Sequence, residues 1–188
     1  MNIIVKPYGE SGWYCRPDTT WERESKDFYV PEGIMEVRWA PVVYVKISKA
    51  GKCIGKKFVT RYYDSFNAGA LLYCQRSTGE EPVAFTSCAD HSSLLPSPTR
   101  NAAELDDAGI DYEVLKDSVK IFETDLSSMK TALEEAICTA SKLTSLRIGD
   151  YVAVEMSPVS TLATAEKKVT SLKISSADKT LYDINIIF

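Results

Sequence analysis

The stretch Glu36-Val37-Arg38-Trp39-Ala40-Pro41-Val42-Val43-Tyr44-Val45-Lys46-Ile47 decides the fold of this chain. Alternate positions fall on opposite faces of an extended chain, and one face carries the aliphatic side chains of Val43, Val45 and Ile47. This two-residue period predicts a β-strand, and we expect it to be the central strand of the protein. Pro41 cannot donate a hydrogen bond to a neighbouring strand, so we expect a sheet edge or a β-bulge there.

Turn and strand signals continue on either side of this stretch. Residues 48–52 favour a turn, residues 53–63 a short helical turn, and residues 66–74 a second apolar strand. Further strands are expected, and their predicted ranges are 3–5, 111–115, 119–123, 169–174 and 181–188.

One long amphipathic helix is predicted in the second half of the chain. Apolar residues recur there at spacings of three and four, at Met129, Leu133, Ala136, Ile137, Ala140 and Leu143. Ser127 or Ser128 is the expected N-cap. The apolar stripe of this helix should lie on a sheet.

Composition and charge exclude several classes of protein. The chain has 188 residues, 45% of them hydrophobic and 26% charged, which suits a single globular domain. Its net charge is -4, and its Lys and Arg residues are scattered, so no basic patch for nucleic acid is expected. Five cysteines without a Cys-x-x-Cys spacing favour neither a disulfide framework nor a zinc site. Because no apolar run suits a signal peptide or a membrane span, we expect a cytoplasmic protein without a membrane partner.

Several short motifs resemble the fumarylacetoacetate hydrolase family. They are Tyr29-Val30-Pro31, Glu36-Val37-Arg38-Trp39, Val43-Tyr44-Val45-Lys46-Ile47, Gly51-Lys52, and Arg61-Tyr62-Tyr63-Asp64 followed by Gly69. The likeness covers residues 27–75 and, more loosely, residues 118–157. It implies an α+β fold that is mainly β, with mixed and antiparallel sheets in a rolled β-sandwich, as in the C-terminal domain of the family, and one long packed helix. It also implies one domain over residues 1–188 with a shortened N-terminal segment, and a homodimer.

The metal site of the family is where this chain departs most clearly from the resemblance. Family members hold Mg²⁺ or a similar divalent cation with two glutamates at alternate positions of one strand and an aspartate from a later strand. Aligned on the motifs above, these three positions are Ala40, Val42 and Leu71. Hydrocarbon side chains offer a hard cation no lone pairs. The resemblance therefore predicts no catalytic residue, no metal and no cofactor at these positions.

Other family motifs are also altered. The segment that carries a substrate-directed His and Glu in the family has no histidine here, and the family's Lys-Gly-[Phe/Cys]-Asp motif corresponds to residues 84–90, which lack lysine but end in Asp90. The family's Gly-Thr-Pro becomes Met-Ser-Pro, in which Ser157 keeps a hydroxyl. Arg16 lies in Trp-Tyr-Cys-Arg-Pro-Asp-Thr, which resembles the family's Phe-x-Lys-Pro-x-Ser. We expect the residual pocket to be formed by Arg16, Asp90, His91 and Ser157.

Two functions follow from these departures. The first is a protein that has lost the metal-dependent hydrolase or decarboxylase site and binds a small molecule, or acts as a structural or regulatory subunit. The alternative is an active enzyme that cleaves carbon–carbon bonds of an acylpyruvate or a related 2-oxo acid. Its rearranged site would contain Glu80, Glu81, Asp90, His91 and Ser157. An interaction module unrelated to the family is a third hypothesis. His91, the only histidine, is expected to have a surface or structural role.

Overall fold

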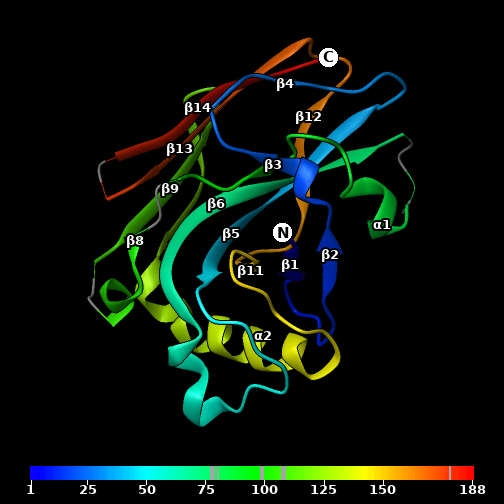
Figure 1. The fold of residues 1–188 in the computed structure, drawn as a ribbon. Helices are drawn as coiled ribbons and strands as arrows, with labels where there is room; N and C mark the ends of the chain where they lie inside the picture. Colours follow the sequence, from blue (N-terminus) through cyan, green and yellow to red (C-terminus); the bar gives the residue numbers. More distant parts are fainter. Residues whose placement is uncertain (77–78, 80, 98–99, 107–108, 178) are drawn as a thin grey trace.

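The computed structural model describes residues 1–76, 79, 81–97, 100–106, 109–177 and 179–188, which form two β-sheets and one long helix (Figure 1). The strands of the larger sheet follow the order β2-β1-β11-β5-β6-β7-β3, with β12 also paired to β5 and β8 to β6. Their bounds are β1 Ile3–Lys6, β2 Tyr14–Arg16, β3 Trp21–Glu22, β5 Glu36–Ile47, β6 Tyr63–Gln75, β7 Ser93–Leu94, β8 Arg100–Asn101, β11 Tyr151–Glu155 and β12 Ser160–Thr164.

The smaller sheet has the order β10-β9-β13-β14-β4. Its strands are β4 Phe28–Tyr29, β9 Asp111–Lys116, β10 Val119–Asp125, β13 Val169–Ser176 and β14 Lys179–Ile187. The helices are α1 Val83–Thr86 and α2 Lys130–Leu143, and short 3-10 turns lie at Asp18–Thr20, Lys56–Arg61, Ala102–Asp106 and Leu126–Met129. The expected mainly β fold with mixed sheets and one long helix is confirmed.

The β5–β6 pair forms the centre of the structure, as expected. The two strands pair without interruption from Glu36 opposite Gln75 to Lys46 opposite Ser65, and Figure 1 shows them as long curved strands with α2 across one end. Val43, Val45 and Ile47 lie in the main core, which also contains residues of α2 and of the smaller sheet. The opposite face of the same strands forms a second, smaller core with residues of β1 and β11. One pair of strands therefore separates two apolar layers.

The prediction of an edge or a bulge at Pro41 is wrong, because β5 has neighbours on both sides and its pairing with β6 is regular there. The Pro41 carbonyl accepts a hydrogen bond from the backbone N–H of Met156 (2.9 Å). Since N and C=O of one strand residue point the same way, the missing donor of Pro41 also faces this side. Pairing with β11 ends there at Val42, and pairing with β12 starts at Trp39. The proline thus occupies the gap between two successive partner strands.

Two details of the predicted helix are also wrong. The helical segment begins with a 3-10 turn whose cap is Asp125, because its carboxylate accepts the backbone N–H of Ser127 (2.9 Å), and neither Ser127 nor Ser128 caps α2. Leu143 is 78% exposed, since it lies in the last turn of the helix, where the apolar stripe has left the core. The stripe from Leu133 to Ala140 is buried as expected.

No helix in the part of the chain that the structure describes combines the length and the apolar character needed to cross a membrane.

Candidate ligand-binding site

The three residues that the resemblance aligns with the family's metal ligands, Ala40, Val42 and Leu71, lie together. Ala40 on β5 is the register partner of Leu71 on β6, and Val42 follows two residues later on the same face of β5. All three are 0% exposed and belong to the smaller core. Hydrocarbon therefore fills the space around them. Across the described ranges, no group of three or more His, Cys, Asp or Glu side chains is arranged to hold a metal ion.

A cavity of about 450 Å³ lies beside this apolar cluster. Its volume falls within the range of small-molecule pockets. Residues from β2, β5, β6 and β11 contribute to its wall, including Tyr14, Arg38, Tyr73 and Glu155. Strand register explains this convergence, because residues directly opposite each other in a sheet share a face: Glu155 is opposite Val42, and Tyr73 is opposite Arg38.

Tyr14, Tyr73 and Glu155 form a hydrogen-bonded chain at the wall of this cavity. The Tyr73 hydroxyl donates to Oε1 of Glu155, and the hydroxyls of Tyr14 and Tyr73 are 2.6 Å apart. Because a phenol carries one proton, Tyr14 is then the donor to Tyr73. The second carboxylate oxygen, Oε2, accepts the backbone N–H of Tyr8 (2.9 Å).

Burial sets the protonation of this chain. Glu155 is 4% exposed, and the loss of hydration raises the pKa of its carboxyl group above the usual value. Burial also raises the pKa of Tyr14 to about 12 and that of Tyr73 well above 10, so both phenols stay protonated at neutral pH. The site therefore combines two neutral hydroxyl donors with one carboxyl group that resists ionisation.

Arg16 lies beneath this chain and is 1% exposed. Its Nε donates to the backbone carbonyl of Ser87 (2.8 Å), and its Nη2 donates to that of Leu72 (2.5 Å) and to Oγ of Ser92 (3.0 Å). The guanidinium carbon is 5.1 Å from the ring centre of Tyr73. Within the described part of the chain, Nη1 has no hydrogen-bond partner. Arg16 thus links β2 to β6, and it is not among the described residues that line the cavity.

Most of the other candidates lie away from this cavity. Glu81 lines it and accepts hydrogen bonds from the backbone N and the Nε of Arg76 (2.7 and 3.1 Å). His91 is exposed, and its Nδ1 lies 2.9 Å from Oε2 of Glu22. Asp90 is exposed, and the hydroxyl of Ser157 donates to the carbonyl of the next residue (3.4 Å).

Glu80 lies outside the described residues. Of the five residues of the expected rearranged site, only Glu81 is a described lining residue of the cavity.

Sequence reasoning missed Tyr14, Tyr73 and Glu155 as members of one site. A signal was present for two of them. Tyr73 follows Leu71 by two residues, so it shares a strand face with the residue that the resemblance aligns with the family's aspartate, and Glu155 is an acidic residue at the end of the apolar strand β11. No such signal marks Tyr14, because β2 has only three residues and is too short to show an alternating pattern.

Stability should depend on pH through Glu155. The unfolded chain ionises this carboxyl near pH 4.5, its usual pKa, whereas the folded protein ionises it at a higher pH because the group is buried. Between the two pKa values the folded state binds a proton that the unfolded state has lost. The free energy of unfolding should therefore fall as pH rises through this window, and Glu155→Gln should remove that decrease.

Urea unfolding from about pH 4 to about pH 7 measures this difference. Glu32→Gln, at an exposed position, is the matched control and should follow the wild type. A pH profile of Glu155→Gln that runs parallel to the wild type would contradict the assignment of Glu155.

Comparison with known proteins identifies the fold. Neither a protein-family model nor a curated protein matches the sequence. Fumarylpyruvate hydrolase from Pseudomonas aeruginosa, solved with Mn²⁺ and pyruvate, superimposes with a TM-score of 0.80 at 12% identity, over 100% of this chain and 90% of that one. Fumarylacetoacetate hydrolase from Exiguobacterium antarcticum gives 0.79 at 11% identity, over 99% of this chain and 74% of that one.

A third solved structure, maleylpyruvate hydrolase from Sphingobium sp. SYK-6 with manganese(II) and pyruvate, gives a TM-score of 0.74 at 15% identity, over 99% of this chain and 69% of that one. The chain therefore has the fold of the fumarylacetoacetate hydrolase proteins. At these identities the likeness is one of fold.

Proposed function

We propose that this chain is a fumarylacetoacetate hydrolase-like protein that works without a divalent cation and binds a small organic molecule in the cavity beside β5 and β6. The observation that supports the proposal is that Ala40, Val42 and Leu71, the residues that the resemblance aligns with the family's metal ligands, are fully buried and lie side by side. A divalent cation needs several oxygen ligands at about 2.0–2.6 Å, and these side chains have none. A homodimer and a cytoplasmic location belong to the same proposal, on the resemblance alone.

The cavity suits a ligand with an apolar surface and hydrogen-bonding groups. Its aromatic wall includes Tyr8, Trp13, Tyr14 and Tyr73, which provide contact area and hydroxyl groups. Glu155 contributes a carboxyl group at the end of the hydroxyl chain. A ligand that donates a hydrogen bond to this chain would form a buried, charge-assisted contact when Glu155 is ionised.

The alternative function is an active enzyme for an acylpyruvate or a related 2-oxo acid. One observation favours it: a buried carboxyl group with a raised pKa faces a cavity, as is common for general acids and bases. In that case Glu155 would be the general acid or base, a residue that the expected rearranged site of Glu80, Glu81, Asp90, His91 and Ser157 did not include. Glu155 would take a proton from the water that attacks the acyl carbonyl carbon, and return it to the methylene carbon when the bond between these two carbons breaks to give a carboxylic acid and pyruvate.

Metal titration tests the proposal. Mg²⁺, Mn²⁺ and Ca²⁺ should leave the thermal midpoint of the wild-type protein unchanged. A cation that did bind the folded state would be detected, because a ligand at 100 times its Kd adds about 2.7 kcal/mol of stability. The variant A40E/V42E/L71D is the matched comparison, since it places three carboxylates at the same positions. It should be less stable than the wild type without metal and should gain stability with Mn²⁺.

A midpoint that rises with one of these cations in the wild type would overturn the metal-free proposal. Turnover of an acylpyruvate by the metal-free wild type, lost in Glu155→Gln, would select the enzymatic alternative.

A further inference from the structure

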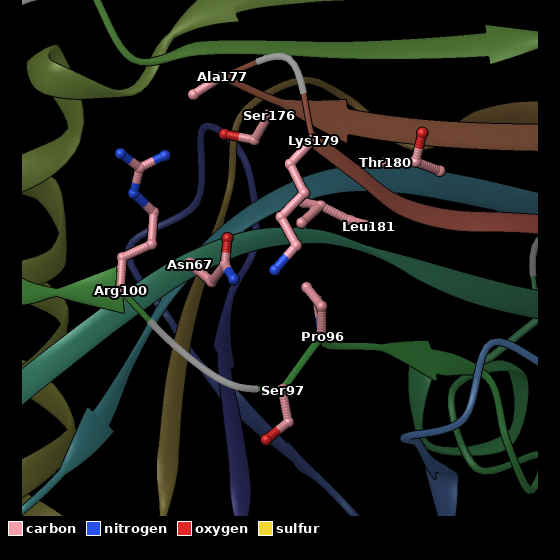
Figure 2. Close-up of a pocket in the computed structure, with 9 residues that line it drawn as sticks. All are labelled: Asn67, Pro96, Ser97, Arg100, Ser176, Ala177, Lys179, Thr180 and Leu181. Carbon is pink, nitrogen blue, oxygen red and sulfur yellow. The ribbon is translucent and has the colours of Figure 1, made fainter.

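A second cavity, of about 290 Å³, lies between β6, the segment that follows β7, and the hairpin of β13 and β14 (Figure 2). Asn67, Pro96, Arg100, Ser176 and Lys179 are among its lining residues. None of the described residues that line it also lines the larger cavity. The Tyr44 hydroxyl donates to the carbonyl of Pro96 and holds one wall in place.

A buried polar group without a partner lies in this cavity. Ser176 is 4% exposed, and its hydroxyl has no hydrogen-bond partner within the described ranges. Figure 2 shows this hydroxyl pointing away from Lys179, toward the side on which the guanidinium of Arg100 lies, with the amide of Asn67 below it. A buried hydroxyl that makes no hydrogen bond costs about 1–3 kcal/mol, so a ligand that accepts a hydrogen bond from Ser176 would remove this cost.

Basic side chains line this cavity, although the whole chain carries a net charge of -4. Both charged residues among its described lining are basic, Arg100 and Lys179. Arg100 is held in place by Glu104, with Nε and Nη2 at 2.9 and 2.7 Å from Oε2. In Figure 2 the amino group of Lys179 reaches over the cavity toward Asn67.

We propose that this cavity binds the oxyanion group of a small molecule, a phosphate or a carboxylate. Lys179 supplies the compact positive charge, and the hydroxyl of Ser176 donates the hydrogen bond that it lacks in the free protein. Arg100 adds a second positive charge whose position is fixed by Glu104. The volume of about 290 Å³ admits a small ligand. This site is independent of the function proposed above.

Calorimetric titration of the full chain with inorganic phosphate and, separately, with malonate at constant ionic strength tests this proposal. At least one probe should bind with saturation and a stoichiometry of one. Lys179→Met should weaken its binding by about tenfold. Ser176→Ala should weaken it by about fivefold without lowering the thermal midpoint, because the substitution removes an unpartnered group. The two probes distinguish a phosphate site from a carboxylate site.

Lys173→Met is the matched control, because Lys173 is exposed on the neighbouring part of β13 and its loss changes the net charge equally. It should leave the affinity unchanged. Failure of both probes to saturate, or equal weakening by Lys173→Met and Lys179→Met, would overturn the proposal.

Discussion

Replacing Arg16 with methionine should lower the free energy of unfolding by about 4 kcal/mol. Arg16 is the hydrogen-bond donor to two buried backbone carbonyls, those of Ser87 and Leu72, and each buried acceptor left without a donor costs about 1–3 kcal/mol. The two backbone groups of Leu72 have different partners. Its N–H donates to the carbonyl of Ser92 next to β7 (2.8 Å), and its carbonyl accepts from the guanidinium of Arg16. Arg16 thus replaces a sheet bond that the short strand β7 does not supply.

Chemical denaturation of Arg16→Met measures this loss. Arg147→Met is the matched control, because Arg147 is exposed and its loss should change stability by less than about 0.5 kcal/mol. The near-ultraviolet signal of the tyrosines should also change in Arg16→Met, since the guanidinium lies against Tyr73. If the two variants are equally stable, Arg16 does not hold β2 to β6.

Gly69→Ala should be nearly as damaging, with a loss of about 3 kcal/mol. A Cβ atom on Gly69 would lie 2.1 Å from the backbone oxygen of Leu94, a contact that only a shift of main chain can relieve. Gly69 is opposite Val42 on β5, so the shift would spread into the apolar cluster and the cavity beside it. The absence of a side chain at Gly69 lets the segment of β7 cross β6 at short distance.

Gly12→Ala provides the comparison for this variant. A Cβ on Gly12 would meet no atom within 4 Å, so this substitution should be close to neutral. Thermal unfolding of the two variants side by side separates a general effect of glycine replacement from the clash with Leu94. Equal midpoints for Gly69→Ala and Gly12→Ala would show that β7 moves aside at little cost.

The elements that the sequence predicted well are those with long local patterns. The alternation of Val43, Val45 and Ile47 located β5, and the spacing of Leu133, Ala136 and Ile137 located α2. In both cases the apolar spacing recurs over several helical turns or strand residues, so one atypical residue does not obscure the pattern. The same period places Ala40 and Val42 on one face of β5, whereas their contact with Leu71 depends on the pairing of β5 with β6.

The two-residue strands β3, β4, β7 and β8 had no such signal. Each of them contains one residue for each face, and each is extended because a distant segment supplies its hydrogen bonds. Dependence on distant segments also explains why the sequence did not predict the residues that line the cavity. Tyr14, Tyr73 and Glu155 are separated by 59 and 82 residues, so their contact depends on strand order.

The sequence by itself determined that Ala40, Val42 and Leu71 offer a cation no ligands, because their side chains lack lone pairs in any conformation. It also determined the central strands and the helix through their periodicity. Only the tertiary structure decided which polar groups face the neighbouring cavity. Burial and strand pairing brought Glu155, Tyr73 and Tyr14 together and raised the pKa of Glu155, and neither burial nor long-range pairing is a property of a short stretch of chain.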